Sequence, residues 1–160
     1  MKTCTLCFPL RKAPEPQVLL GLKKPRLNAG KWSGFGGKVE EGETLEQAAL
    51  RELFEESSLQ ASPKSLEHVA ELNFTFTVNP AWNQVVHVFL THDFEGEPSE
   101  SDEMLPKWFH FNEIPFEAMW KDDPHWLPLV LDGKKLKARF SFGSDNASVA
   151  SQEVTIVDSL

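Results

Sequence analysis

The chain has little cysteine, no long apolar run and no excess of basic residues. Two cysteines among 160 residues make a disulfide framework unexpected. No stretch approaches the ~18 apolar residues that span a bilayer, and no apolar N-terminal segment ends in a cleavage site. The net charge of -8 argues against a nucleic-acid polymer as partner, because such partners select basic surfaces. We therefore expect a cytoplasmic protein, with the nucleus and mitochondria as further compartments.

The two cysteines, Cys4 and Cys7, have the C-x-x-C spacing of half a zinc site. The sequence contains no second pair, and in a strand these two positions point to opposite faces. We expect two reduced thiols.

The pattern of apolar and turn residues predicts an α/β fold that forms one domain over residues 1–160. Strands are expected at 3–10, 17–24, 66–78, 84–92, 107–111, 135–142 and 152–158, and a short one near Phe35 within the loop 25–43. A helix is expected at 44–57, with Thr44 and Gln47 as a capping box. A second should begin with Asp123 as N-cap and run to about Leu131. Strand 84–92 is apolar on both sides, which favours a central position.

Three glutamates of the first expected helix, Glu52, Glu55 and Glu56, share one face because they stand at i, i+3 and i+4. Their mutual repulsion costs a few tenths of a kcal/mol per pair even in water. A hard cation would stabilise them, since Mg²⁺ prefers carboxylate and water oxygens and bridges to phosphates. The glycines Gly36 and Gly37 allow close backbone approach and offer a carbonyl ligand. The alternative is a solvated acidic helix face, which is common.

The segment 37–59 resembles the Nudix box, G-x5-E-x7-R-E-U-x-E-E-x-G-U, in which U is apolar. Eight positions match: Gly37, Glu43, Arg51, Glu52, Leu53, Glu55, Glu56 and Leu59. The second glycine of the pattern is replaced by Ser58, at a place after the helix where glycine usually adopts positive φ. Serine there should cost about 1 kcal/mol of strain or force a different cap.

Beyond the box, the chain resembles the MutT-homologue branch of the Nudix hydrolases, which act on oxidised purine nucleoside triphosphates. The similar segments are VLLGLKK at 18–24, AGKWSGFGGKV at 29–39, ESDEM at 100–104 and PFEAMWKDDPHWLPL at 115–129. The resemblance implies an αβα sandwich with a mixed central sheet and two main helices. It also implies a monomer that sanitises the nucleotide pool. With Mg²⁺, or alternatively Mn²⁺, it would convert 8-oxo-dGTP or 2-hydroxy-dATP to the monophosphate and pyrophosphate.

The resemblance also implies individual roles. The metal ligands would be Gly36, Gly37, Glu52, Glu55, Glu56 and Glu103. Glu52, Glu56 and Glu103 are the catalytic candidates, and Glu56 competes with Glu103 as general base. Glu43 and Arg51 would brace the loop against the helix by an ion pair. Substrate contacts are implied for Thr5, Lys23, Ser33, Phe35, Gly36, Gly37, Lys38, Phe74, Phe76, Trp120, Asp122, Asp123 and Trp126.

In the implied base pocket, an indole face suits a purine by stacking. The adjacent acids Asp122 and Asp123 can read the edge of the base, because a protonated acid donates where an ionised one only accepts. Without the resemblance, we would interpret the two acids as a helix N-cap, and Trp120 and Trp126 as residues that pack in the hydrophobic core. Ser33 replaces an asparagine of the family. The loop 78–85 is one residue longer and lacks a methionine, for which Trp82 is the candidate replacement, whereas His87 reads as structural.

Other functions remain open at this point. The replacement of the family asparagine by Ser33 leaves open a Nudix enzyme that acts on another nucleoside-diphosphate substrate, such as a dinucleotide polyphosphate or ADP-ribose. A nucleotide-binding module without catalysis would show degenerate box carboxylates, and here they are intact. A diphosphate isomerase on the same fold would carry a reactive cysteine near the active site, and Cys4 and Cys7 lie too early.

Overall fold

A computed structural model describes residues 1–12, 14–24 and 29–160, so parts of the expected turn at 11–16 and loop at 25–43 lie outside the described residues. Within them, nine strands form one sheet: β1 (Lys2–Arg11), β2 (Gln17–Lys23), β3 (Trp32–Ser33), β4 (Phe35–Lys38), β6 (Glu67–Phe76), β7 (Gln84–Thr91), β9 (Met104–His110), β10 (Lys135–Phe142) and β11 (Val149–Val157). Two short strands, β5 (Gln60–Ala61) and β8 (Phe94–Glu95), pair with each other. The α-helices of the described residues are α1 (Leu45–Ser57) and α2 (Asp123–Leu131), and short 3-10 helices are present at Pro63–Ser65, Pro80–Trp82, Phe111–Glu113 and Phe116–Ala118.

The sheet is mixed, and its main path runs β11-β10-β6-β7-β1-β2-β3, while β4 pairs with β1 and β9 pairs with β2. The pairs β1–β7 and β6–β10 are parallel, and the other pairs are antiparallel. The expected central position of strand 84–92 is confirmed, because β7 lies between β6 and β1.

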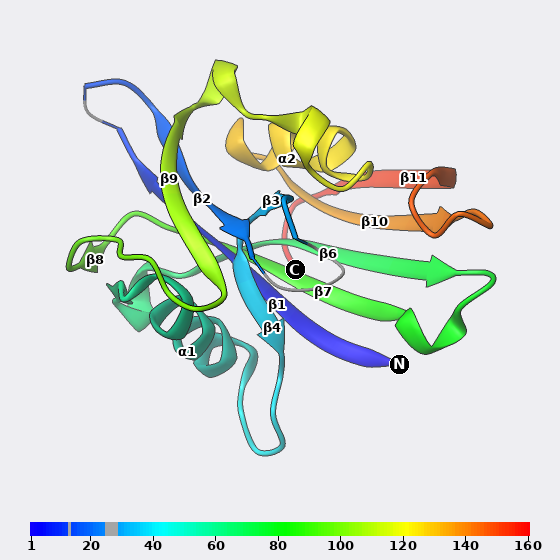
Figure 1. Cartoon of the computed structure of the whole chain (residues 1–160), viewed down its shortest axis with the longest axis horizontal. Coiled ribbons are helices and arrows are strands. Elements are labelled where there is room, and N and C mark those ends of the chain that lie inside the picture. Colours follow the sequence, from blue (N-terminus) through cyan, green and yellow to red (C-terminus); the bar gives the residue numbers. More distant parts are fainter. Residues whose placement is uncertain (13, 25–28) are drawn as a thin grey trace.

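The two helices cover opposite faces of the sheet (Figure 1). Adjacent residues of β1 show this division: Cys7 packs in the cluster that contains Leu53 of α1, whereas Phe8 meets Trp126 of α2 edge-on. Each such large side chain contributes about 1.5–3 kcal/mol when it leaves water. The expected αβα sandwich is confirmed, as is the expectation that Cys4 and Cys7 are free thiols on opposite faces of β1.

Helix α1 begins with the expected capping box. The Thr44 hydroxyl accepts from the Gln47 amide at 3.1 Å, and the Gln47 side chain accepts from the Thr44 amide at 2.9 Å. At the other end, Ser58 adopts φ 69° and ψ 5°, the left-handed conformation that the box pattern reserves for glycine. The expected strain is therefore present. The Ser58 hydroxyl also contacts that of Ser99 at 2.7 Å.

Some boundaries differ from the sequence prediction. Strand β9 begins at Met104 and not at 107, because it pairs with β2 along its whole length, from Lys23 to Gln17. Strand β11 begins at Val149 and not at 152, because its pairing with β10 continues past an irregularity between Ser141 and Phe142. No helix in the described part of the chain is long and apolar enough to cross a membrane.

Candidate active site

The glycines of β4 lie between β1 and the acidic face of α1. The Gly36 amide donates to Oε1 of Glu56 at 2.8 Å. A Cβ at Gly36 would overlap the carbonyl oxygen of Thr5, and one at Gly37 would lie 2.6 Å from Oε1 of Glu52. Close packing of backbone against backbone therefore requires glycine at position 36, and a side chain at position 37 would displace the Glu52 carboxylate.

Arg51 fastens the preceding loop to α1 through a two-pronged contact with Glu43. Its Nε lies 2.7 Å from Oε2 and its Nη2 lies 2.9 Å from Oε1, which confirms the expected ion pair. Hydrogen bonds from Arg51, together with the Glu40 amide, lower the pKa of Glu43 to about 2. The same guanidinium reaches Glu52 at 2.9 Å and Glu55 at 3.4 Å. The loop and the acidic face are thus held by one cation.

Glu56 is the buried member of the acidic group, with 3% of its surface exposed. Burial raises its pKa to about 8, and a hydrogen bond with Glu103 and the charge of Glu52 act in the same direction. The ammonium of Lys23 and the amide of Gly36 partly oppose this rise. Burial also raises the pKa of Glu52. The protein therefore holds carboxylates close together with too little positive charge to keep them readily ionised.

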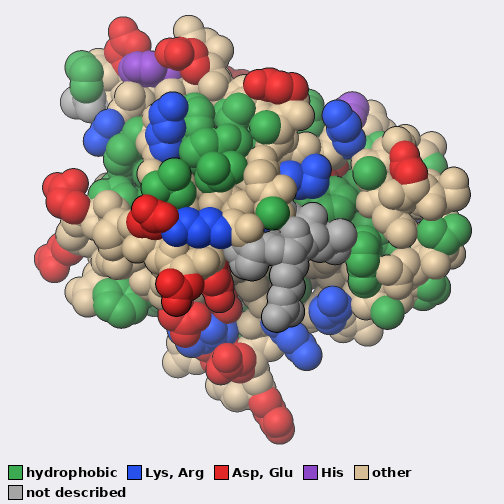
Figure 2. All heavy atoms as spheres, viewed as in Figure 1, with side chains coloured by type: hydrophobic (Ala, Val, Ile, Leu, Met, Phe, Trp, Pro, Cys, Tyr) green, Lys and Arg blue, Asp and Glu red, His purple; other side chains and the backbone are tan. Residues whose placement is uncertain are grey.

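A hard divalent cation fits this donor set, because Glu52, Glu55, Glu56 and Glu103 offer only oxygen ligands. Acidic side chains gather over α1 and the loop before it (Figure 2). Among the described residues, however, no three His, Cys, Asp or Glu side chains already stand in an arrangement that could hold a metal ion. Glu52 and Glu55 are in contact with Arg51 instead. A cation at the acidic face would compete with Arg51 for Glu52.

A cavity of about 220 Å³ lies on the α2 side of the sheet and extends to the two glycines of β4. Eleven of the thirteen expected substrate-contact residues line it: Thr5, Lys23, Ser33, Gly36, Gly37, Phe74, Phe76, Trp120, Asp122, Asp123 and Trp126. The structure thus brings together residues from both ends of the chain. The hydroxyl of Thr5, a residue 2% exposed, has no hydrogen-bond partner within the described residues, so it can serve a ligand.

Two expected substrate-contact residues lie elsewhere. The Phe35 side chain does not line the cavity, because it is fully buried on the α1 face of the sheet, in the cluster of Leu53 and Met104, and its substrate contact stays a prediction. Strand alternation explains this, since Gly36 and not Phe35 faces the cavity. Lys38 is exposed and does not line the cavity, and its contact with phosphates stays a prediction.

The acidic pair lies deep in the cavity wall, with Asp122 3% and Asp123 9% exposed. The indole N–H of Trp126 donates to Oδ2 of Asp122 at 2.8 Å. Burial raises the pKa of both acids, and the charge of Asp122 and a hydrogen bond to it raise that of Asp123 further. The pair therefore retains a proton at pH values where free aspartates are ionised.

The sequence expectation for the start of α2 is wrong. Asp123 is the first helical residue, and Asp122 occupies the N-cap position without a side-chain capping hydrogen bond. The Asp122 side chain instead meets Trp126 and Asp123, so it is used in the cavity wall and not in capping. The plain N-cap reading of this pair is excluded for the geometry seen here.

Sequence reasoning missed six lining residues: Cys4, Leu6, Leu72, Gln84, Val86 and Phe142. Strand alternation back from Phe74 finds Leu72, and the pairing of Phe74 with Gln84 brings Gln84 to the same face. Trp82, the expected replacement for the missing methionine, does not line the cavity. Its ring packs edge-on against that of Phe76, with the ring centroids 5.5 Å apart, outside the cavity lining.

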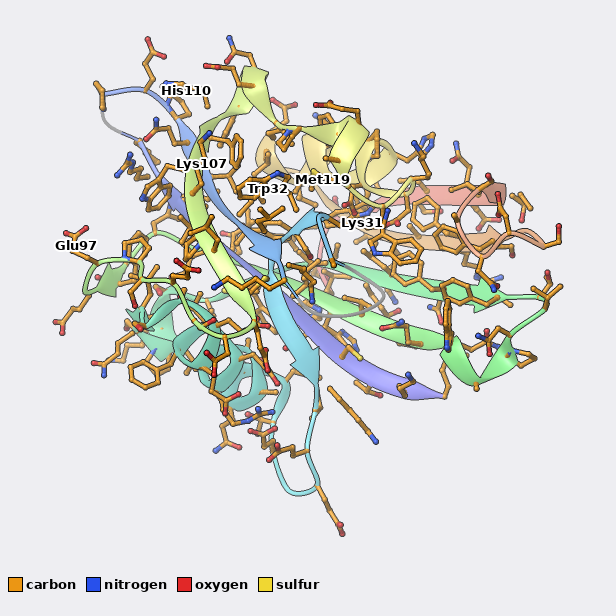
Figure 3. The ribbon with its side chains drawn as sticks, in the orientation of Figure 1. Lys31, Trp32, Glu97, Lys107, His110 and Met119 are labelled. Carbon is orange, nitrogen blue, oxygen red and sulfur yellow. The ribbon has the colours of Figure 1, made fainter. Side chains whose placement is uncertain are left out.

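Two further groups lie near these sites. The Lys31 ammonium, labelled in Figure 3, is 5.4 Å from the ring centroid of Trp120. His87 lies outside the cavity lining and contacts His68, with Nδ1 and Nε2 3.1 Å apart. Burial lowers the pKa of both histidines, in keeping with the structural role expected for His87.

The sequence model of the NUDIX domain matches residues 4–130, which include the acidic face and most of the cavity wall. The chain belongs to the NUDIX family. Members of this family use divalent metal ions, in agreement with the oxygen-only acidic group on α1.

Individual relatives extend this similarity along the chain. The chain is 46% identical over 146 residues to an oxidized purine nucleoside triphosphate hydrolase of Mus musculus, covering 91% of each protein. It is 49% identical over 126 residues to a protein of the same name in Danio rerio, covering 79% of each. A MutT protein from Bacillus halodurans has the same fold, with a TM-score of 0.80 at 24% identity over 96% of this chain and 97% of that one.

Proposed function

We propose that this NUDIX protein is a Mg²⁺-dependent hydrolase of oxidised purine nucleoside triphosphates that releases the monophosphate and pyrophosphate. The names of the Mus musculus and Danio rerio relatives support this substrate class. The carrying observation is the position of Gly36 and Gly37, which line the cavity while they contact Glu56 and Glu52. A base in the cavity would therefore place its phosphates at the acidic face.

At the base end, aromatic side chains and buried acids supply two kinds of recognition. Phe74, Phe76 and Trp120 give the apolar surface against which a purine stacks. Asp122 and Asp123 share retained protons, so one can donate to the base while the other accepts. Oxidation changes donors and acceptors on the purine edge, which is the feature that such a pair distinguishes.

At the phosphate end, Lys23 lies where its charge reaches Glu56 and the cavity, which suits an anionic chain between the two. A divalent cation, when bound, supplies polarisation of the phosphorus and a lower pKa of the attacking water. In the proposed reaction the water oxygen bonds to one phosphorus of the α–β diphosphate link. The P–O bond from that phosphorus to the bridging oxygen breaks, and the products are the monophosphate and pyrophosphate. We assign the acceptance of the water proton to whichever of Glu56 and Glu103 is ionised, since the two carboxyl groups lie close enough to affect each other.

We also propose that residues 1–160 act as a single domain. Strands β10 and β11 lie beyond residue 130, yet β10 pairs with β6 along Leu136–Phe142, and Phe142 lines the cavity. Strand β10 thus contributes to the proposed base-binding wall.

The experiment is turnover of unmodified and oxidised nucleoside triphosphates with Mg²⁺, with the products separated. We expect 8-oxo-dGTP and 2-hydroxy-dATP to give monophosphate and pyrophosphate with greater catalytic efficiency than dGTP and dATP. A chelator should abolish the reaction and added Mg²⁺ should restore it. Preferred cleavage of ADP-ribose or a dinucleotide polyphosphate, or undiminished activity in chelator, would overturn the proposal.

A further inference from the structure

The loop between β8 and β9 carries Glu103 to the acidic face and runs beside the C-terminal end of α1 (Figure 1). Glu97, labelled in Figure 3, marks the start of this loop next to β8. Glu103 itself is exposed, whereas its partner Glu56 is buried on the helix. Since an exposed loop residue has many available positions, some contact must set its distance from Glu56.

The hydroxyl of Ser101 makes that contact. It donates to the backbone carbonyl of Glu56 at 3.0 Å and lies 3.3 Å from the Glu103 amide and 3.1 Å from the Met104 amide, both of which donate to it. A serine hydroxyl has one donor and two acceptor positions, and all three are used here. One side chain thus joins the last turn of α1 to the backbone of Glu103.

The backbone of the same turn is fixed from two other sides. The Ser101 amide donates to the Met104 carbonyl at 2.9 Å, and the Lys24 ammonium contacts the Ser101 carbonyl at 2.7 Å. The Lys24 side chain also pairs with Glu100, and the backbone amide of Lys24 donates to the Glu103 carbonyl at 3.0 Å. Buried Met104 anchors the end of the turn in the core. The turn is therefore held as a unit, and the Ser101 hydroxyl connects it to the helix.

We propose that Ser101 is a positioning residue for the divalent-metal site, acting by holding Glu103 against Glu56. It touches neither the cavity nor the acidic side chains, and it acts through the backbone of both glutamates. Groups that orient metal-binding side chains typically contribute 10–100-fold to metal affinity or activity. The role of Glu103 in catalysis rests on the proposed function, whereas the effect on metal binding does not.

The test is Mn²⁺ binding to the full chain without nucleotide, measured by titration of the free ion signal in electron paramagnetic resonance. We expect Ser101→Ala to raise the Mn²⁺ dissociation constant about tenfold and Ser101→Thr to restore it. Ser99→Ala is the matched control, because Ser99 lies in the same loop and contacts Ser58. It should change the constant by less than about twofold.

A second pair of variants keeps the proposal testable if Ser101→Ala does not fold. Ser101→Thr and Ser101→Val have the same shape and differ in the hydroxyl. Equal Mn²⁺ affinity in Ser101→Thr and Ser101→Val would overturn the proposal. So would a loss of Mn²⁺ affinity in Ser101→Ala that is no larger than the loss in Ser99→Ala.

A double-mutant cycle separates positioning from general loosening. With an oxidised nucleoside triphosphate as substrate, Ser101→Ala should lower kcat about tenfold, leave KM within about twofold, and have no further effect in a Glu103→Gln background. Fully additive losses would contradict action through Glu103. If the wild type binds Mn²⁺ but cleaves no oxidised nucleotide, the proposed function fails while the binding comparison still decides the role of Ser101.

Discussion

Glu43, in the loop before α1, and the acidic pair beside α2 differ in the direction in which the protein shifts their pKa. Glu43 is held ionised by the fork of Arg51, with a pKa of about 2. The pKa of Asp123 is raised well above its usual value by burial and by the neighbouring Asp122. Glu43 therefore keeps its negative charge, whereas the acidic pair keeps a proton.

Glu56 stands between these two kinds of site. It lies in the acidic face, yet burial raises its pKa as it does for the aspartates. The difference lies in the neighbours, since Glu56 has Lys23 and the Gly36 amide close by. We therefore expect that metal chemistry and base recognition can be changed separately by substitutions in the two regions.

The largest expected effect is at the acidic face. Glu56→Gln keeps the shape of the side chain and removes its charge, so we expect kcat to fall by about 100-fold or more. Folding should survive, because a neutral amide is less costly to bury than a carboxylate. Steady-state rates together with thermal melting give the answer. Near-normal turnover in a folded variant would remove Glu56 from the mechanism.

The next effect is at the acidic pair. Asp122→Asn imitates a protonated acid, and its amide oxygen can still accept from the Trp126 indole. We expect the preference between 8-oxo-dGTP and 2-hydroxy-dATP, measured as a ratio of catalytic efficiencies, to change about tenfold, since one good hydrogen bond is worth about 1 kcal/mol or more. Metal dependence should not change. The same preference in variant and wild type would show that Asp122 does not read the base.

The acidic pair also predicts a pH dependence of stability. The folded protein retains protons that the unfolded chain releases near pH 4, so this contribution is complete below that pH. It is lost as the pH rises through the raised pKa of the folded pair. Relative to the wild type, Asp123→Asn should therefore gain free energy of unfolding above pH 4, about 1.4 kcal/mol for each unit between the folded and unfolded pKa values. Denaturant unfolding from pH 4 to 8 measures this, and a constant difference would contradict it.

The same contrast explains what the sequence predicted well. The acidic face comes from one segment, in which helical spacing brings Glu52, Glu55 and Glu56 together and a capping box marks the helix start. The ion pair of Glu43 with Arg51 followed from the box resemblance. Helical spacing was sufficient for the acidic face and the cap, whereas the ion pair needed the resemblance.

The cavity depends on contacts between distant segments, and there the sequence was less informative. Gln84 enters the lining through its pairing with Phe74, which needs a strand register that the sequence does not specify. Phe35 was included among the substrate contacts because the alternation of a four-residue strand is too short to show from sequence that its side chain faces away from the cavity. Asp123 looked like a helix cap because Asp before Pro is a common start signal, but burial in the cavity wall decided its position.

The smallest expected effect is at the end of α1. Ser58→Gly removes the backbone strain at this position, because a residue with a Cβ pays about 1–2 kcal/mol to adopt the left-handed conformation. The gain is partly offset by the greater freedom of glycine in the unfolded chain, about 0.4–1 kcal/mol, and by loss of the exposed hydroxyl contact with Ser99. We expect a net rise of about 0.5 kcal/mol in the free energy of unfolding, and unchanged turnover. Ser58→Ala, which keeps the Cβ and loses the Ser99 contact, should instead be less stable than the wild type.

Competition between 8-oxo-dGTP and 2-hydroxy-dATP in one reaction tests the separation of the two regions most directly. The ratio of their catalytic efficiencies is measured for the wild type, Glu56→Gln and Asp122→Asn. Glu56→Gln should slow both substrates together and leave the ratio within about twofold of the wild-type value. Asp122→Asn should move the ratio about tenfold while the rate for the favoured substrate is kept. A ratio that moves with Glu56 or stays fixed with Asp122 would contradict the division between a metal-binding and a base-reading region.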